Sequence, residues 1–408
     1  MDPKELARNI DINEYEYNLP EDRIAQYPAE KRDHSMLLVH KSGRIRSDKF
    51  TNIYKYLPPD TMLVFNNTRV IRARILFRKE TGSTIEIFCL EPILPATYDQ
   101  SLGSHKAVEW KCLVGNLKKW KTGALSTSFF CNNKEFKLNA EKIRSSGQAM
   151  IIRFSWEPEE ISFGEVIESV GHIPLPPYVK RDDEEHDYLR YQTVFSAIDG
   201  SVAAPTAGLH FTEDLLDKIV SKGILCTELT LHTGAGTFRP VKTNDLSLHE
   251  MHCEHYIITR KLIELLLEHR NKVIACGTTS VRTLESIYWL GVKLLSDPGS
   301  SGLPLFTDQW EPYGNNSDIT VEESLKTVLR LFHENNCQKI NASTKLMIIP
   351  GYEFRMITGM ITNFHLPKST LLLLLSAWTG PEWKNIYKFA LENNYRFLSY
   401  GDGSLLMK

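Results

Sequence analysis

Two histidines stand in short polar segments that also contain glycine and threonine. His210 lies in APTAGLHFT (204–212), and His232 lies in LHTGAGTFRPV (231–241). Imidazole titrates near neutral pH, so a histidine in a cleft can accept or donate a proton. Both segments are therefore candidates for general acid–base chemistry.

The residues around these histidines predict the elements that position them. A short apolar run, Ser201–Ala204, can be a buried strand that ends at a proline. Thr212 is suited to cap a helix that stops at Gly223, and Ile224–His232 is rich in β-forming residues. Parallel strands joined by a helix end at the same edge of a sheet, where open α/β sheets bind ligands. We therefore expect one cavity bordered by His210, His232, Gly234, Gly236 and Arg239.

A second strand-to-helix turn has a similar character. Val273–Cys276 is an apolar strand candidate, and GTTSVR (277–282) leads into a helix predicted to end near Gly291. Hydroxyl residues at such a turn are ordinary helix caps, but the free N–H groups there can also seat an anion. Further strands are expected at Leu346–Ile349 and Tyr395–Ser399, again followed by turns with small residues.

Length and composition indicate an ordinary soluble protein. The chain has 408 residues and a net charge of −2, and its length favours two domains. Its seven cysteines are scattered and form no C-x-x-C pair, which is typical of reduced thiols in the cytoplasm. The charged N-terminus lacks the apolar core of a signal peptide, and the longest apolar run, Leu371–Leu375, is far too short to span a membrane. We expect a cytoplasmic protein without membrane contact.

The pattern of apolar and polar residues changes between residues 61 and 156. Short segments there alternate apolar and polar residues between Gly and Asn turns, as in a small antiparallel barrel or sandwich. We predict an α/β domain with a mixed or parallel sheet from residues 1–60 and 157–408, and an inserted antiparallel β-barrel domain from residues 61–156. The acidic, proline-containing residues 157–187 are expected to form an ordered connecting loop or a lid.

Positive charge gathers near the start of this insertion. Between Lys41 and Glu80 there are ten Lys or Arg and three Asp or Glu, a net charge of +7. Residues 110–121 add further lysines around two tryptophans. Such a cluster is usually a solvated surface, but in a chain that is otherwise acidic it modestly favours contact with the phosphates of a nucleic acid.

Several common motifs do not occur in the sequence. The nucleotide-binding fingerprints G-x-G-x-x-G and G-x-x-x-x-G-K-[ST] are absent, and so is the G-x-S-x-G elbow. HEMHCEH (249–255) contains three histidines, but its spacing fits neither H-E-x-x-H nor H-x-x-E-H. We therefore expect no metal site.

Ten longer stretches, distributed from end to end, carry a resemblance to a known family. They are YNLPEDRIAQYPAEKRD (17–33), VFNNTRVIRAR (64–74), GHIPLPPYVKRDDEEHDYLRYQTVF (171–195), APTAGLHFT (204–212), LHTGAGTFRPV (231–241), LHEMHCEHY (248–256), GTTSVRTLES (277–286), PGYEF (350–354), TNFHLPKSTLL (362–372) and YRFLSYGD (395–402). In this order they resemble the S-adenosylmethionine:tRNA ribosyltransferase-isomerase family, which makes epoxyqueuosine in queuosine biosynthesis.

The resemblance implies an enzyme that transfers and isomerises the ribosyl part of S-adenosylmethionine. The acceptor would be 7-aminomethyl-7-deazaguanine in a tRNA anticodon, and adenine and methionine would be released. Because S-adenosylmethionine is consumed as a substrate, no cofactor is expected. The resemblance also implies a monomer with an α/β domain and an inserted β-barrel, in agreement with the pattern of residues 61–156.

The implied chemistry needs a base, because a sulfonium acidifies the adjacent C5′–H, and an acid for the leaving adenine. We predict His210 and His232 at the reacting ribose and His365 as a third candidate, with a hydrogen-bonded structural role as an equal alternative for each. Thr278, Thr279 and Ser280 would seat the methionine carboxylate at a helix start. The full predicted set for substrate binding is Thr206, Gly234, Gly236, Arg239, Thr278, Thr279, Ser280, Arg282, Asn363 and Asp402. The predicted set for nucleic-acid binding is Arg69, Arg72, Arg74, Lys118, Lys119 and Lys121.

The chain also departs from this family's pattern at several positions. Asn67 replaces the usual Asp, Thr233 and Ala235 replace Val and Leu, and Lys345 lies where an Asp-bearing segment is usual. Asn67 is a neutral amide that cannot act as a base, whereas HTGAGTFRP and TNFHLP are intact. Two other interpretations therefore stay open: a tRNA- or nucleoside-binding protein without turnover, and a transferase with a different acceptor.

Overall fold

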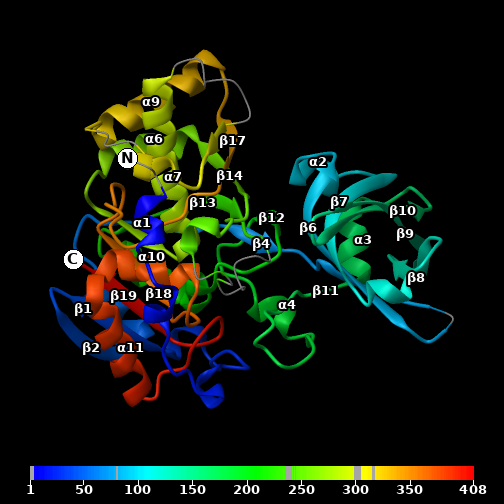
Figure 1. Cartoon of the computed structure of the whole chain (residues 1–408), viewed down its shortest axis with the longest axis horizontal. Coiled ribbons are helices and arrows are strands. Elements are labelled where there is room, and N and C mark those ends of the chain that lie inside the picture. The colour runs from blue at the N-terminus through cyan, green and yellow to red at the C-terminus, as the bar shows by residue number, and fades with distance from the viewer. Residues whose placement is uncertain are drawn as a thin grey trace.

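The computed structural model describes residues 4–79, 81–234, 241, 243, 245–297, 305–314 and 318–408. They form two parts that lie side by side, a larger α/β part and a smaller part of mainly antiparallel strands (Figure 1). Two short strands, β4 (Thr68–Val70) and β12 (Ile198–Ser201), pair with each other where the chain passes between the parts (Figure 1). The mixed α/β class predicted from the sequence is confirmed.

The larger part is built on a ten-stranded mixed sheet. Its strand order is β16 (Leu305–Thr307), β17 (Lys339–Thr344), β14 (Glu254–Thr259), β13 (Leu225–His232), β3 (Met62–Asn66), β15 (Val273–Cys276), β18 (Gly359–Asn363), β19 (Gly403–Met407), β1 (Met36–Lys41) and β2 (Arg44–Lys49). The neighbouring strands β13, β3, β15 and β18 run parallel, so their carboxyl ends lie at one edge. β19 runs antiparallel to β18 and therefore begins at the same edge.

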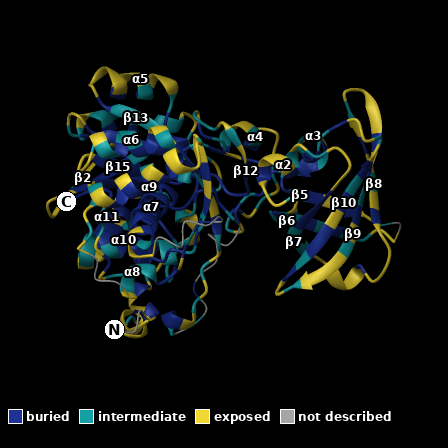
Figure 2. Ribbon diagram, turned by 90° about the horizontal axis from the view of Figure 1, so that it is seen from above, coloured by how far each residue is buried: buried dark blue, intermediate teal, exposed yellow. Residues whose placement is uncertain are grey.

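Helices pack against this sheet, and the most buried is α7 (Thr278–Ser296). It lies in the interior along most of its length, whereas α5 exposes one side (Figure 2). The other helices of the larger part are α1 (Glu5–Arg8), α5 (Glu213–Ser221), α6 (Arg260–Glu268), α8 (Glu311–Gly314), α9 (Val321–Glu334), α10 (Thr370–Thr379) and α11 (Trp383–Glu392). None of the described helices is long and apolar enough to cross a bilayer.

The smaller part is a seven-stranded antiparallel sheet that curls around its own core (Figure 1). Its order is β11 (Gly171–His172), β5 (Arg74–Arg78), β6 (Thr84–Leu94), β7 (Ala107–Gly115), β10 (Ala149–Glu157), β9 (Lys134–Ser146) and β8 (Leu125–Cys131), with the helices α2 (Tyr98–Leu102) and α3 (Phe163–Val170) beside it. Trp110, Trp156 and Phe163 are fully buried in that core. Among the described residues no pairing joins β8 to β11 or β5, so the closed barrel remains a prediction.

The first strand of the predicted insertion belongs to the larger part. Residue 61 is the predicted boundary, but Met62–Asn66 forms β3, which pairs with β13 and β15. Its continuous apolar sequence is typical of a strand that is covered on both faces. The seven-stranded sheet begins at Arg74. The division into two domains remains a prediction, with β3 on the α/β side.

Three predicted strands differ in the structure. Ser201–Ala204 is buried, but only Ser201 belongs to a strand, β12, which pairs with β4 and not with β13. The predicted strand–helix–strand unit within one sheet is therefore wrong, because the parallel neighbour of β13 is β3. Leu346–Ile349 is buried without a strand, since side chains bond its backbone: Leu346 N–H donates to Thr344 Oγ1 over 2.9 Å. Tyr395–Ser399 is likewise no strand, and the last strand is β19.

Candidate active site

A cavity lies at the edge of the ten-stranded sheet where β13, β15 and β18 end. Each strand contributes the residues at or just after its carboxyl end: Thr233 from β13, Gly277–Thr279 from β15 and Asn363–His365 from β18. Thr206 and Ser399 also line it. We call this the central cavity. No described lining residue carries a formal charge at neutral pH.

Three polar atoms of the cavity wall have no hydrogen-bond partner among the described residues. They are Thr233 Oγ1, Thr279 Oγ1 and Asn363 Oδ1, and all three are buried. A buried polar atom without a partner costs free energy that the fold does not recover by itself. Because the three atoms come from three separate turns, the arrangement favours a ligand that supplies the missing hydrogen bonds.

The amino ends of two helices also meet the cavity. Thr278 and Thr279 form the first turn of α7, and Ser369 caps α10 by accepting a bond from Leu372 N–H over 3.2 Å. The first N–H groups of a helix have no partner within it, and its dipole places positive potential there. Gly277, which precedes α7, has a φ of 90°, a backbone conformation that favours glycine. A carboxylate would be stabilised at this end of the cavity.

His365 is the only imidazole among the described residues that line the central cavity. Its Nε2 lies 2.9 Å from Thr362 Oγ1, and its backbone N–H donates to the Tyr387 hydroxyl over 2.9 Å. Its carbonyl oxygen accepts from the Tyr17 hydroxyl. Burial lowers the pKa of the ring to about 3. At neutral pH the ring is therefore neutral, so it can accept a proton but has none to donate as an imidazolium.

His210 lies behind the cavity wall rather than in it. The amide of Asn363 separates them, with Nδ2 of Asn363 3.2 Å from Nε2 of His210. Nδ1 of the ring is 2.7 Å from Ser35 Oγ, and the ring stacks on Phe50 at 4.6 Å between centroids. Burial, together with the charges of Arg396 and Arg32, lowers its pKa to about 3.

His232 lines a second cavity, between the two sheets. This inter-sheet cavity is bordered by Glu91 and Lys111 on one side and by His232, Gly234 and His255 on the other. The His232 ring stacks on Tyr98 at 4.2 Å, and its Nδ1 is buried without a partner among the described residues. Burial, and then the neighbouring His255, lower its pKa to about 4. Thr233 faces the central cavity, so the end of β13 separates the two cavities.

Several other residues that were predicted to bind substrate form hydrogen bonds or ion pairs within the protein instead. Arg282 pairs with Glu254 and donates to the carbonyl of Leu346 over 3.1 Å, which ties α7 to its neighbours. Ser280 Oγ donates to the carbonyl of Cys276 over 2.7 Å. Asp402, 2 % exposed, accepts from the backbone N–H of Met36 and Arg396 over 2.8 and 2.7 Å. Gly236, Arg239 and the variant position Ala235 lie outside the described residues.

The residues predicted to bind nucleic acid fall into two groups. The arginines are paired with carboxylates: Arg69 with Asp199 at 3.8 Å, Arg72 with Glu168 at 3.1 Å and Arg74 with Glu86 at 2.8 Å. The lysines Lys118, Lys119 and Lys121 are exposed. Trp110 and Trp120, which stand near them in the sequence, are buried. The role of each predicted residue in catalysis or binding remains a prediction.

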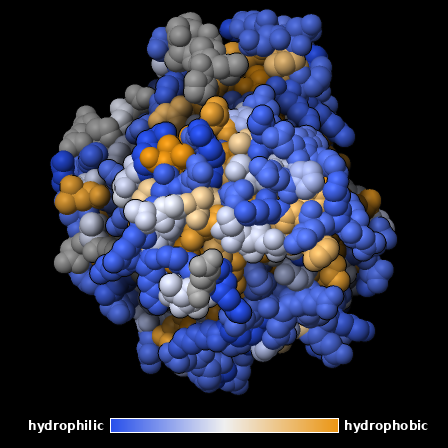
Figure 3. Space-filling model, turned by 90° about the vertical axis from the view of Figure 1, so that its right-hand side faces the viewer, coloured by the Kyte–Doolittle hydropathy of each residue, from blue (hydrophilic) through white to orange (hydrophobic). Residues whose placement is uncertain are grey.

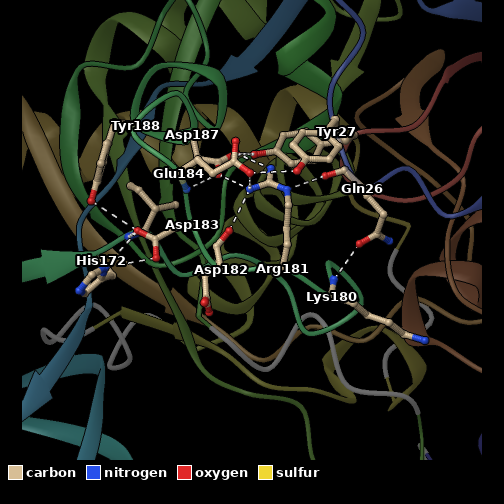
Figure 4. A network of polar contacts seen from close by, with 12 residues as sticks. Gln26, Tyr27, His172, Lys180, Arg181, Asp182, Asp183, Glu184, Asp187 and Tyr188 are labelled. Atoms are coloured by element: carbon tan, nitrogen blue, oxygen red, sulfur yellow. Dashed lines mark hydrogen bonds and ion pairs between the residues drawn. The ribbon is translucent and has the colours of Figure 1, made fainter. Parts of the chain in front are cut away.

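The segment 171–190, here called the connector, is held by a polar network (Figure 4). Arg181 donates to both carboxylate oxygens of Asp187 over 2.6 and 2.8 Å, and the Tyr400 hydroxyl donates to Asp187 over 2.7 Å. Lys180 N–H donates to the side chain of Gln26 over 2.7 Å. The prediction of a loop over residues 157–187 holds only for 173–186, because Phe163–Val170 forms helix α3 and Gly171–His172 forms strand β11.

The connector also supplies a wall residue that sequence reasoning missed. Tyr178 lines the central cavity, and its hydroxyl lies 2.6 Å from Ser399 Oγ, which lines it as well. A tyrosine after a proline pair carries no local signal of such a role. Only the resemblance of the long stretch 171–195 to a known family pointed to this segment.

The departures at Asn67 and Lys345 lie outside the central cavity. Asn67 Nδ2 donates to Glu228 over 2.9 Å, and its Oδ1 accepts from Thr230 over 2.7 Å. A carboxylate at position 67 would stand against Glu228, so the amide suits this chain. Lys345 lines the inter-sheet cavity. Among the described residues no three His, Cys, Asp or Glu side chains are arranged to hold a metal ion.

Comparisons with known proteins cover nearly the whole chain. A sequence family described as "Queuosine biosynthesis protein" matches residues 12–406. The S-adenosylmethionine:tRNA ribosyltransferase-isomerase of Syntrophomonas wolfei is 38 % identical over 402 residues, covering 97 % of this chain and 97 % of that protein. The protein of the same name from a Thermoanaerobacter species is 38 % identical over 404 residues, covering 97 % and 99 %. A crystal structure of S-adenosylmethionine tRNA ribosyltransferase from Thermotoga maritima is 28 % identical and covers 97 % of this chain and all of that one, with a TM-score of 0.45.

Proposed function

The chain belongs to the queuosine biosynthesis protein family, and we propose that it is an S-adenosylmethionine:tRNA ribosyltransferase-isomerase. In this reaction the ribosyl part of S-adenosylmethionine is transferred to 7-aminomethyl-7-deazaguanine in a tRNA anticodon and isomerised to give epoxyqueuosine. Adenine and methionine leave. The observation that carries the proposal is the central cavity, with its three buried and unpartnered polar atoms from three strand ends.

S-adenosylmethionine occupies the central cavity in this proposal. Its methionine carboxylate lies at the start of α7, where Thr278 and Thr279 offer N–H groups and the helix dipole favours an anion. The hydroxyl of Thr279 and the carbonyl of Asn363 then gain the hydrogen bonds that they lack. Because the donor is consumed, no resident cofactor is needed.

His365 is the base that the geometry favours in this cavity. Burial keeps its ring neutral at pH 7, so one ring nitrogen carries a lone pair that can take the C5′ proton beside the sulfonium. The imidazolium formed in that step can then protonate adenine as the glycosidic bond breaks. A single imidazole thus serves as base and then as acid. His232, at the other side of the β13 end, is the alternative base if the reacting ribose extends toward the inter-sheet cavity.

The acceptor is a tRNA, which reaches the cavities from the side of the smaller part. The curled sheet, whether or not its edges close into the predicted barrel, presents lysines on that side. We propose a monomer that works in the cytoplasm and needs neither a metal nor a membrane.

The test is an assay of adenine and methionine release. The full chain is incubated with S-adenosylmethionine and tRNA that carries 7-aminomethyl-7-deazaguanine, with tRNA that lacks this base as the control. We expect one adenine and one methionine for each modified nucleotide. Binding of both substrates without release would contradict the proposal and favour a protein without turnover, and release only with another RNA or with the free base would show a different acceptor.

A further inference from the structure

Six lysine and arginine residues of the smaller part lie on or beside the loop 117–121 and the end of β5. The residues concerned, here called the basic tip, are Arg78, Lys79, Lys118, Lys119, Lys121 and Lys142. Among the described residues no carboxylate lies within ion-pair distance of any of them, whereas Arg74, four residues before Arg78, is paired with Glu86 at 2.8 Å. Within the part of the chain that the structure describes, the tip therefore carries positive charges without carboxylate partners.

The loop that carries half of these residues is held from several sides. Lys79 Nζ donates to the carbonyl of Lys119 over 3.0 Å, and Lys142 Nζ donates to the carbonyls of Trp120 and Lys121 over 2.7 and 3.1 Å. The Trp120 ring is 1 % exposed, and its Nε1 donates to the carbonyl of Gly123 over 2.9 Å. These bonds fix the backbone of residues 117–121, so Lys118, Lys119 and Lys121 extend into solvent from a rigid base. Less ordering is then needed when they meet an anionic partner.

Strand β6 sets the distance from the basic tip to the cavities. Its first residue, Thr84, accepts from the side chain of Asn116 over 3.0 Å, next to the lysine loop. Leu90 and Glu91, farther along the same strand, line the inter-sheet cavity. Seven residues of strand correspond to about 23 Å. One nucleotide is too short to reach from the basic tip to the inter-sheet cavity. A folded RNA can contact the tip with its backbone while one of its nucleotides binds at the cavities.

We propose that the basic tip binds the phosphate backbone of a base-paired arm of the acceptor RNA, in an inference that rests on the proposed function. Lysine ammonium groups act as point charges toward phosphates. The buried Trp120 offers no ring for stacking on a base, so the tip contacts the backbone without reading the sequence. The face on the side of the smaller part is hydrophilic over much of its rim, with hydrophobic side chains exposed across its middle (Figure 3).

Two triple variants with the same change of charge test this inference. The first is Lys118→Gln/Lys119→Gln/Lys121→Gln. The matched control is Lys41→Gln/Arg44→Gln/Arg46→Gln, whose residues are exposed on the β1–β2 hairpin at the far edge of the ten-stranded sheet. The readouts are binding of tRNA at several salt concentrations and adenine release at saturating tRNA. Loss of three phosphate contacts should weaken tRNA binding roughly tenfold to a hundredfold near physiological salt, and should reduce the slope of log affinity against log salt by roughly 2 to 3.

The expected pattern is weaker tRNA binding and a shallower salt dependence in the first variant alone. An RNA hairpin with a shortened stem should bind the first variant and the unaltered protein equally. Equal weakening by the control triple variant, or unaltered tRNA binding by the first one, would overturn the inference. Failure of the proposed function would give a different result, because the unaltered protein would then release no adenine. Its tRNA binding could still be compared with that of both variants.

Discussion

The side-chain amide of Asn363 donates to Nε2 of His210 over 3.2 Å. The same amide nitrogen donates to the carbonyl of Leu398 over 3.1 Å, which leaves Oδ1 of Asn363 without a partner among the described residues. On the other side of the ring, Ser35 Oγ donates to the carbonyl of Arg32 over 3.4 Å and can accept from Nδ1 of His210. The neutral ring, with its proton on Nδ1, thereby orients Asn363 at the central cavity. We infer that His210 acts through Asn363 and does not touch a ligand in the central cavity itself.

The first prediction concerns the pH dependence of stability. The pKa of His210 is about 3 in the folded protein and about 6.5 in an unfolded chain. Between these values the unfolded chain binds a proton that the folded chain does not. The contribution of His210 to the free energy of unfolding should therefore be complete above pH 6.5. Below pH 6.5 this contribution should fall by about 1.4 kcal/mol per pH unit.

Urea unfolding of the unaltered protein and of His210→Gln at pH 7 and pH 5 measures this effect. The variant has no titrating ring at this position, so its stability should depend less steeply on pH by about that amount. It should also bind S-adenosylmethionine more weakly, since Asn363 loses its acceptor. Equal pH slopes would show that the buried ring does not carry the shift.

The second prediction concerns the unpartnered hydroxyl of Thr279. Thr279→Val removes a group that has no bond in the free protein, so stability should be unchanged or slightly higher. The dissociation constant for S-adenosylmethionine should rise about threefold to tenfold, the usual worth of one hydrogen bond. Thr283→Val is the matched control, because Thr283 Oγ1 donates within α7 to the carbonyl of Thr279 over 2.9 Å. For this control, calorimetric titration should show an unchanged dissociation constant, and urea unfolding should show lower stability.

Local chemistry near the candidate site could be predicted from the sequence. Thr212 caps α5 by accepting from Leu215 N–H over 3.2 Å, and Gly223 has a φ of 77°, as expected for a residue just after a helix. The turn after β15 does begin a helix at a cavity. These features depend on a few neighbouring residues, which is why sequence patterns identify them.

Long-range partners could not be predicted in the same way. The strand beside β13 is β3, more than 150 residues earlier in the chain, and an apolar run such as Leu346–Ile349 can be buried without pairing as a strand. Arg282 has a guanidinium suited to a carboxylate ligand, but the carboxylate that it meets is Glu254 on β14. Which charged group neutralises which is decided by tertiary packing, and spacing along the sequence does not reveal it.

The third prediction separates His365 from His232 as the base. His365→Asn should reduce the rate of adenine release at saturating substrates by about a hundredfold or more, the usual effect of losing a general base. Binding of S-adenosylmethionine should change little, which equilibrium dialysis would measure. His232→Asn should retain most of the rate if the base lies in the central cavity. A large loss of rate in His232→Asn with a nearly active His365→Asn would instead place the base at the inter-sheet cavity.

The fourth prediction concerns the network that holds the connector. Asp187 is 1 % exposed and accepts two bonds from Arg181, one from Tyr400 and one from the backbone N–H of Glu184. Asp187→Asn removes the charge that compensates a largely buried guanidinium and leaves one acceptor oxygen in place of two. Because breaking a buried pair leaves the other charge unpaired, we expect a loss of about 3 kcal/mol in the free energy of unfolding.

Glu184→Gln is the matched control variant. The Glu184 side chain is 53 % exposed, lies 3.8 Å from Arg181, and accepts from the Tyr27 hydroxyl, a bond that glutamine can keep. Its replacement should change stability by less than about 0.5 kcal/mol. Urea unfolding measures both variants. In Asp187→Asn, but not in Glu184→Gln, faster proteolysis within residues 171–190 and a higher KM for S-adenosylmethionine should appear, since Tyr178 of the connector lines the central cavity. If both variants resist proteolysis like the unaltered protein, the Arg181–Asp187 pair does not hold that wall in place.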